Sequence, residues 1–122
     1  MAHILVVDDD FTILNLIKDV LTPQGHAVEL SSSGADALRK IHKTRFDLLI
    51  LDRNMPSMDG LEVLRTLKAD PAVAGLKVIM CTAADMLADV DEAFQSGAID
   101  YVVKPLDMAK MNAKVARHTK RS

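Results

Sequence analysis

The run Leu48-Leu49-Ile50-Leu51, which ends at Asp52, constrains the fold more than any other stretch of the chain. An unbroken apolar run of this length is typical of a strand that is buried on both faces of a parallel sheet. Pro56 and the pair Asp59-Gly60 then stop the strand and turn the chain. Asp52 is therefore predicted at the carboxyl end of a central strand, where open α/β sheets place their functional groups.

Strand-like and helix-like segments alternate along the rest of the chain. Short β-branched or apolar runs predict strands at 3–7, 27–31, 47–52, 76–81 and 99–103. Apolar residues at helical spacing follow each run and predict helices that begin near Phe11, Ser33, Asp59, Ala83 and Met108. Because parallel neighbours need a crossover helix, this alternation predicts an α/β fold with one doubly wound sheet.

The predicted architecture is a five-stranded parallel sheet with five helices, in a single domain over residues 1–122 without an effector domain. The common order for such a small sheet is the flavodoxin-like 2-1-3-4-5, although the pattern alone does not determine it. In that order the first and third strands are neighbours, so Asp8 and Asp9 would face Asp52 across a shallow cleft.

The composition excludes several classes of function. The chain is 49% hydrophobic, which is enough for a core without metal or disulfide staples, and Cys81 is its only cysteine. The formal net charge of -2 gives no general attraction to nucleic acid or to anionic membranes. The sequence shows no targeting signal and no apolar run long enough to span a bilayer, so we expect a cytoplasmic protein.

The predicted cluster of carboxylates needs a counter-charge. Three carboxylates that lie close together cannot all stay ionised, because each raises the pKa of the others. Either one of Asp8, Asp9 and Asp52 is protonated or a cation lies among them, and oxygen ligands suit a hard cation such as Mg²⁺. The alternative is that these aspartates only terminate strands and cap helices, as Asp10 could do for the helix at Phe11.

Two further polar residues end the predicted fourth and fifth strands. Lys104, which precedes Pro105, could reach across the sheet edge toward Asp52 and pair with a carboxylate or a phosphoryl oxygen. Thr82 offers a hydroxyl between these positions. Taken alone, such a lysine is an ordinary surface cation and such a threonine is an ordinary helix cap.

Four motifs occur in order along the chain: Val6-Val7-Asp8-Asp9, Leu51-Asp52-Arg53-Asn54-Met55-Pro56-Ser57-Met58-Asp59-Gly60, Thr82-Ala83 and Tyr101-Val102-Val103-Lys104-Pro105. Together they resemble the receiver domain of two-component response regulators, and the resemblance covers essentially the whole chain. The segments around Asp52 and Tyr101 are most similar to those of single-domain chemotaxis regulators.

The resemblance implies a phosphorylation site at Asp52. This residue would accept a phosphoryl group from a histidine kinase or a phosphotransfer protein. Asp9, Asp52 and the backbone carbonyl of Asn54 would bind Mg²⁺ directly, and Asp8 would act largely through a bound water. A carboxylate is a competent phosphoryl acceptor, and a cation such as Mg²⁺ or lysine supplies the charge neutralisation that the transfer needs.

The resemblance also implies a switch that reads the phosphoryl group. Thr82 and Lys104 would each contact a phosphoryl oxygen, and Tyr101 would turn inward when Thr82 moves. The surface of the fourth helix, fifth strand and fifth helix would then change and control a downstream protein. The alternative for Tyr101 is a half-buried strand residue with an exposed hydroxyl.

Other family features concern the lifetime of the phosphoryl group. Asn54 and Ala84 occupy positions that tune hydrolysis of the acyl phosphate, and the Lys104-Pro105 peptide bond is often cis in this family. The implied protein is a signalling switch that catalyses only its own phosphorylation and dephosphorylation. We expect a monomer or a weak dimer, and neither nucleic acid nor membrane insertion.

Three rival functions share parts of this pattern. An aspartyl-phosphate phosphatase of the haloacid-dehalogenase type needs a second aspartate at position 54, which is Asn, and usually a cap domain. A flavodoxin-like FMN carrier needs a phosphate-binding loop after the first strand, where three aspartates would repel a phosphate. A receiver-like interaction domain without phosphorylation stays open, although all the key residue types are present.

Basic and histidine residues outside the motifs have simpler interpretations. A basic tail could suggest nucleic acid, but cations favour a helix C-terminus and solvate its outer face. The histidines show no metal-ligand spacing and are interpreted as surface or loop residues. The tail comprises Lys110, Lys114, Arg117, Lys120 and Arg121, and the histidines are His3, His26, His42 and His118.

Overall fold

The computed structural model describes residues 2–56, 58–83 and 87–119, in which strands and helices alternate from the first strand to the last helix. The strands are β1 (His3–Val7), β2 (Ala27–Ser31), β3 (Leu48–Asp52), β4 (Lys77–Ala83) and β5 (Asp100–Lys104). The helices are α1 (Phe11–Leu21), α2 (Gly34–Lys43), α3 (Gly60–Ala69), α4 (Leu87–Gln95) and α5 (Met108–Thr119), and a short 3-10 turn (Thr22–Gln24) follows α1.

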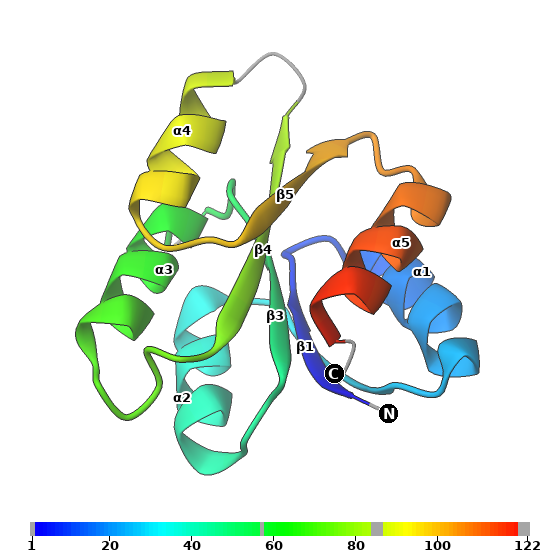
Figure 1. Ribbon diagram of the computed structural model, residues 1–122, viewed down its shortest axis with the longest axis horizontal. Coiled ribbons are helices and arrows are strands. Elements are labelled where there is room, and N and C mark those ends of the chain that lie inside the picture. The colour runs from blue at the N-terminus through cyan, green and yellow to red at the C-terminus, as the bar shows by residue number, and fades with distance from the viewer. Residues whose placement is uncertain (1, 57, 84–86, 120–122) are drawn as a thin grey trace.

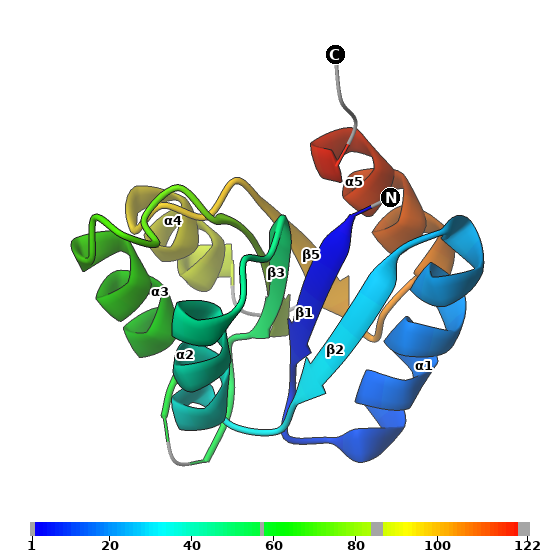
Figure 2. The ribbon, with the colours of Figure 1, turned by 90° about the horizontal axis from the view of Figure 1, so that it is seen from below.

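The strands form one parallel sheet in the order β2-β1-β3-β4-β5, which confirms the predicted fold class and strand order. Helices α1 and α5 cover one face, while α2, α3 and α4 cover the other (Figure 1, Figure 2). Strand β1 lies between β2 and β3, so the ends of the first and third strands are neighbours as predicted. Strand β2 lies at the sheet edge, where a weakly apolar strand is expected.

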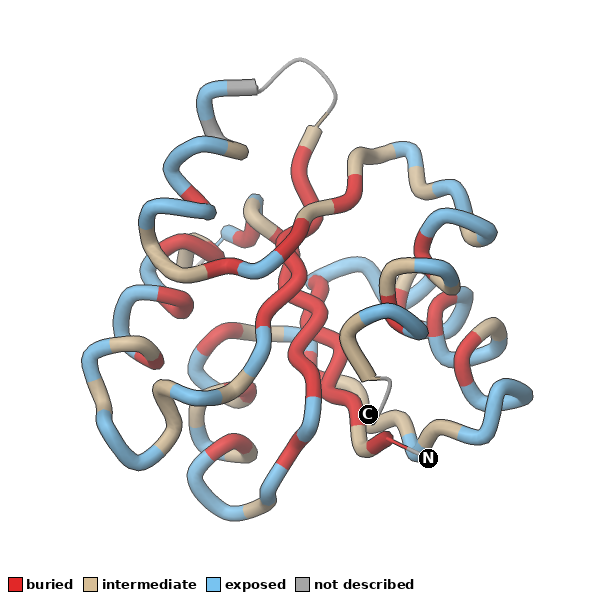
Figure 3. The backbone as a smooth tube through the Cα atoms, in the orientation of Figure 1, coloured by how far each residue is buried: buried red, intermediate tan, exposed pale blue. Residues whose placement is uncertain are grey.

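The sheet separates two apolar layers. Leu49 and Leu51 point into the layer beneath α2, α3 and α4, whereas Leu48 and Ile50 point into the layer beneath α1 and α5. All four side chains are at most 1% exposed, so the β3 run is buried on both faces as its composition predicted. Each such side chain contributes roughly 1.5–3 kcal/mol to folding. Figure 3 shows this buried central strand between outer helices along which buried and exposed residues alternate.

Side-chain caps begin four of the helices in the described part of the chain, and Asp107 is the cap of α5. Asp10 accepts a hydrogen bond from Thr12 N and starts α1, which confirms the interpretation of Asp10 as a cap. Ser33 starts α2 and Asp59 starts α3, where it accepts a hydrogen bond from Leu61 N. These caps fix the points at which the chain leaves the sheet and turns into each helix.

The observed elements differ from the predicted ones at the α4 and β5 side of the sheet. Strand β4 extends to Ala83, and β5 begins at Asp100 rather than at Ile99. Helix α4 buries Ala93, whereas Phe94 is 45% and Ile99 37% exposed. Helix α5 buries Met111 and Val115 as its spacing predicted.

None of the helices in the described part of the chain is both long and apolar enough to cross a bilayer.

Candidate functional site

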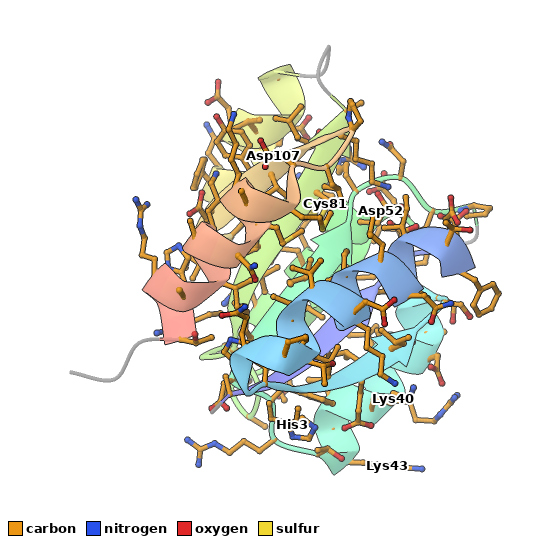
Figure 4. The ribbon with its side chains drawn as sticks, turned by 90° about the vertical axis from the view of Figure 1, so that its right-hand side faces the viewer. His3, Lys40, Lys43, Asp52, Cys81 and Asp107 are labelled. Carbon is orange, nitrogen blue, oxygen red and sulfur yellow. The ribbon has the colours of Figure 1, made fainter. Side chains whose placement is uncertain are left out.

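The predicted site residues converge at the carboxyl edge of the sheet. Asp8 and Asp9 follow β1, Asp52 is the last residue of β3, and Thr82 and Lys104 lie at the ends of β4 and β5. Residue 52 pairs with Cys81 in the β3–β4 register, and Ala83 pairs with Lys104 in the β4–β5 register. Figure 4 labels Asp52 and Cys81 on their neighbouring strands. Parallel pairing thus brings together residues that are up to 96 positions apart in the sequence.

Lys104 joins two buried carboxylates. Its Nζ lies 3.0 Å from Asp8 Oδ2 and 3.1 Å from Asp52 Oδ1. Asp8 is 2% and Asp52 1% exposed, so both carboxylates are shielded from bulk water. The lysine is therefore a counter-charge within the site, and the interpretation of Lys104 as an ordinary surface cation does not hold.

The two oxygens of Asp52 have different surroundings. Oδ1 receives hydrogen bonds from Lys104 and, at 3.2 Å, from the backbone N–H of Asn54. Oδ2 is buried and has no hydrogen-bond partner among the described residues, and the same holds for Thr82 Oγ1. Leaving buried polar atoms unpaired costs free energy, so these two atoms mark a place for a polar ligand.

Burial raises the pKa of Asp52 to about 6, and the charge of Asp8 adds to this effect. The hydrogen bond and charge of Lys104 act in the opposite direction. For Lys104 itself, burial acts to lower its pKa, but its hydrogen bonds with Asp8 and Asp52 outweigh burial and raise it. At neutral pH the site therefore holds an ionised Asp52 beside a protonated lysine.

The acidic residues fit a hard divalent cation. One carboxylate oxygen from each of Asp8, Asp9 and Asp52 can be chosen so that all three lie within 4.8 Å of one another. Asp9 is exposed while the other two are buried, so the cluster opens to solvent on one side. All-oxygen donors and an open face are what Mg²⁺ requires, because it keeps several of its waters.

The loop after Asp52 is packed closely against the strand ends. Arg53 N donates a hydrogen bond to Cys81 O at 2.9 Å, and the Arg53 guanidinium forms an ion pair with Asp59. A Cβ on Gly60 would lie 2.1 Å from Asp52 O, so only glycine allows this approach of α3 to Asp52. The backbone position of Asp52 therefore depends on the residues that follow it, as far as Gly60.

Cys81 and the cis peptide agree with the sequence-based expectations. Cys81 is 2% exposed, and burial raises the pKa of its thiol to about 12, so the residue is a neutral core side chain. The Lys104-Pro105 peptide bond is cis, as the resemblance implied. Ala84, which was expected to affect the lifetime of the phosphoryl group, lies outside the described residues.

Tyr101 lies between a helix on each side. Its ring meets Phe94 of α4 edge-on at 6.0 Å between centroids, and Lys114 Nζ of α5 lies 4.5 Å from its centroid. Lys114 also donates a hydrogen bond to Tyr101 O and pairs with Asp100 at 3.0 Å. Sequence reasoning assigned Lys114 to a solvated helix face and missed these contacts.

The histidines were also interpreted too simply. His118 Nε2 lies 2.8 Å from Asp100 Oδ2, and His42 Nε2 lies 2.8 Å from Asp70 Oδ2. His3 pairs with Glu29 at 2.6 Å. Each pair joins two different elements or loops, so the histidines connect parts of the fold. The separations of 18 to 28 positions left no local sequence signal.

The protein-family model described as the response regulator receiver domain matches residues 4–116. The chain belongs to the response regulator receiver domain family. This finding confirms the resemblance, and membership implies signalling through a phosphoacceptor residue. Receiver domains are signalling switches that interact with kinases and downstream effectors, and they typically bind Mg²⁺ at an acidic pocket.

Curated relatives of this receiver domain are longer proteins. It is 37% identical over 125 residues to the transcriptional regulatory protein ZraR of Klebsiella oxytoca, covering 99% of this chain and 28% of the relative. It is 38% identical over 120 residues to ZraR of Escherichia coli K12, covering 95% of this chain and 26% of the relative. The chain thus spans about a quarter of the length of these relatives.

Two solved structures share the fold over nearly their whole length. A putative response regulator from Chloroflexus aurantiacus superimposes with a TM-score of 0.93 at 31% identity, covering 98% of both chains. The chemotaxis protein CheY4 of Vibrio cholerae gives a TM-score of 0.89 at 31% identity, covering 96% of this chain and 98% of CheY4. The receiver domain is therefore similar in fold to a chemotaxis protein and in sequence to one part of longer transcriptional regulators.

Proposed function

We propose that Asp52 accepts a phosphoryl group from a histidine kinase or a phosphotransfer protein. The observation that carries this proposal is the Asp52 Oδ2 atom, which is buried, unpaired among the described residues and attached to a carboxylate beside Lys104. In the transfer, an Asp52 carboxylate oxygen attacks phosphorus while the bond from phosphorus to the donor's imidazole nitrogen breaks. The imidazole leaves with the electron pair, and an acyl phosphate forms on Asp52.

The neighbouring residues position and neutralise the reacting groups. Lys104 already pairs with Asp52 Oδ1 and, after transfer, pairs with a phosphoryl oxygen instead. Mg²⁺ would be held by Asp9, Asp52 and the backbone carbonyl of Asn54, with Asp8 bound through a water. Such an ion supplies charge neutralisation for the phosphoryl oxygens. The carboxylates of Asp8 and Asp9 would orient such an ion, and Asp9 lies on the solvent-exposed side of the cluster.

The output of the switch belongs to the same proposal. Thr82 Oγ1 is buried without a partner among the described residues, so it donates a hydrogen bond to a phosphoryl oxygen once one is present. Movement of Thr82 toward the site leaves room into which the Tyr101 ring turns. Phe94 of α4 and Lys114 of α5 both contact the ring, so its movement changes the surface made by α4, β5 and α5. This changed surface then controls a downstream protein.

In this proposal residues 1–122 act as one receiver domain that works as a monomer or weak dimer. The name of the ZraR relatives describes full-length transcriptional regulators, of which this chain matches about a quarter. Binding of nucleic acid is therefore not assigned to the receiver domain itself. The phosphatase alternative lacks its second aspartate, because residue 54 is Asn. An interaction domain without phosphorylation would leave the unpaired atoms of Asp52 and Thr82 without a ligand.

The test is incubation with acetyl phosphate and MgCl₂, followed by intact mass measurement. The wild-type chain gains one phosphoryl group, whereas Asp52→Asn gains none. An unlabelled wild type, or undiminished labelling of Asp52→Asn, would contradict the proposal. Turnover of p-nitrophenyl phosphate that depends on Asp52 would support the phosphatase alternative instead.

A further inference from the structure

A second concave site lies at the opposite end of the sheet from Asp52. A groove of about 570 Å³ runs between the α2–β3 loop and the α3–β4 loop. Both loops precede their strands, whereas Asp52 ends β3, so a strand of five residues separates groove and acceptor by about 13 Å. Figure 1 shows these loops at the lower end of the sheet. The volume lies within the range typical of binding sites.

Buried apolar residues line the floor of the groove, and polar residues share the rest of its lining. Ile41 is 5% and Phe46 7% exposed, and both belong to the core beneath α2 and α3. Val73 and Leu76 line the groove from the other loop and are only partly buried. Such a floor favours one large apolar side chain from a ligand, because burial of that side chain removes apolar area from water.

The rim of the groove is positively charged. Lys43 and Arg45 are exposed, and neither forms an ion pair within residues 2–56, 58–83 and 87–119. Lys77 is exposed as well, and its Nζ donates to His118 O at 3.0 Å. The one carboxylate in the lining, Asp47, already accepts a hydrogen bond from His3 N at 2.8 Å.

Other charges near the rim are balanced. His42 lines the groove but pairs with Asp70 at 2.8 Å, so this pair leaves the positive rim unchanged. The whole chain carries a formal net charge of -2, which makes this local excess of cations distinct from the general surface. Complementary charge favours an acidic ligand and raises its rate of association.

We propose that this groove docks an acidic peptide segment of a partner protein, which inserts one apolar side chain between the two loops. Docking is independent of phosphorylation, because the groove and Asp52 lie at opposite ends of β3. Nucleic acid fits less well, since the floor offers no exposed aromatic face for a base: Phe46 is buried and packs against the His3 ring at 4.5 Å. The proposal is independent of the function assigned to Asp52.

The experiment begins with selection of random twelve-residue peptides displayed on phage against the wild-type chain. Counter-selection uses the double variant Lys43→Gln/Arg45→Gln. The peptides that survive are expected to carry several Asp or Glu residues around one Leu, Ile or Phe. Fluorescence anisotropy of a selected peptide then measures affinity, which the double variant should weaken by about fivefold or more.

Gly75 supplies a matched pair of variants. It lines the groove, a Cβ there meets no atom within 4 Å, and its φ is not positive, so longer side chains fit without strain. Gly75→Glu should weaken binding of the selected peptide and Gly75→Lys should strengthen it, each about threefold. Circular dichroism and thermal midpoints close to those of the wild type verify that these variants are folded.

Two controls separate the groove from general charge and from the phosphorylation site. Lys18→Gln/Lys110→Gln removes the same charge from exposed positions on α1 and α5, and Asp52→Asn removes the acceptor, so both should bind the peptide as the wild type does. The proposal is overturned if no selected peptide needs Lys43 and Arg45 for binding, or if the peptides that need them are not acidic. It is also overturned if the two Gly75 variants change the affinity of the peptide in the same direction. Tighter binding of a twelve-nucleotide DNA single strand at this groove would overturn it too.

Discussion

At the scale of single residues, the two carboxylate oxygens of Asp52 differ in their hydrogen-bond partners. Oδ1 is held by Lys104 and by the Asn54 N–H, which fixes the orientation of the carboxylate. Oδ2 is left unpaired among the described atoms, so in the proposed transfer it can react without first losing a hydrogen bond. Burial of this carboxylate costs stability, because it removes the charged form from water.

That cost gives a prediction for Asp52→Asn. Because burial raises the pKa of Asp52 to about 6, the folded state binds the proton more tightly than the unfolded state. This contribution to stability is complete below the unfolded pKa and is lost as pH rises through 6. The asparagine variant should therefore be more stable than the wild type by on the order of 3 kcal/mol at pH 7, and by about half of that at pH 5.

Urea unfolding at the two pH values measures this difference. An equal gain at pH 5 and pH 7 would show that the ionisation of Asp52 is not its cause. Asp47→Asn is a suitable comparison, because this carboxylate is exposed and lies at the other end of β3.

At the scale of elements, the start of α3 fixes the backbone position of Asp52. Alanine in a helix is ordinarily more stable than glycine by roughly 0.5–1 kcal/mol. At Gly60, however, a Cβ would lie 2.1 Å from Asp52 O and 2.9 Å from Arg53 Cα. Gly60→Ala should therefore lower the unfolding free energy by about 1–3 kcal/mol and slow labelling by acetyl phosphate.

Gly75→Ala is the control for this substitution, because a Cβ there meets no atom within 4 Å. It should leave both the thermal midpoint and the labelling rate close to wild type. If Gly60→Ala labels as fast as the wild type, then the close approach of α3 does not position Asp52.

The contact of α5 with β5 gives a prediction for the switch. Lys114 contacts the face of Tyr101, and this contact is worth roughly 0.5–1 kcal/mol. Lys114→Met removes it and should raise the population of the inward ring severalfold before phosphorylation, up to roughly fivefold. Tyr101 is the only tyrosine in the chain, so incorporated fluorotyrosine reports this ring alone by ¹⁹F NMR.

The expected result is a resonance of Lys114→Met that lies between those of the unphosphorylated and phosphorylated wild type. Lys110→Met changes an exposed lysine of the same helix and should leave the resonance in place. A resonance of Lys114→Met identical to that of the unphosphorylated wild type would exclude a role for Lys114 in holding the ring.

Sequence reasoning predicted those features of the elements that depend on nearby residues. The cap at Asp10, the helix starts at Ser33 and Asp59, and the buried run that ends at Asp52 follow from local patterns and were found as expected. The pairing of Lys104 with Asp52 across the strand ends was also predicted. The contacts that helix side chains make with other elements were missed, because they depend on how helices stack on the sheet. The contact of Lys114 with Tyr101 is of this kind.

At the scale of the whole molecule, binding of a cation at one end should stabilise the entire fold. The acidic cluster exists only in the folded chain, so Mg²⁺ at ten times its dissociation constant should add about 1.4 kcal/mol of stability. For a domain of 122 residues this raises the thermal midpoint by about 5 °C. Asp9→Asn removes one of the clustered carboxylates and should abolish most of the increase.

Thermal unfolding with and without MgCl₂ measures this effect. Asp19→Asn changes an exposed carboxylate of α1 and should retain the full increase. Equal stabilisation of Asp9→Asn and the wild type would show that Mg²⁺ acts elsewhere on the molecule.

The two ends of the sheet thus differ in chemistry. Asp8, Asp52, Thr82 and Lys104 gather at the carboxyl end, whereas the groove and its cations lie at the amino end. This separation lets a surface at one end bind a partner while the residues at the other end react. The two ends share β3, which runs from one to the other.

Strand β3 lies between two neighbours, and both of its faces are covered by helices. Its amide hydrogens therefore exchange with water only when most of the fold opens, whereas an outer helix can detach in smaller and more frequent openings. Asp52 is anchored to the part of the molecule that opens last. The helices can consequently move on the timescale of signalling while Asp52 keeps its position for as long as the chain stays folded.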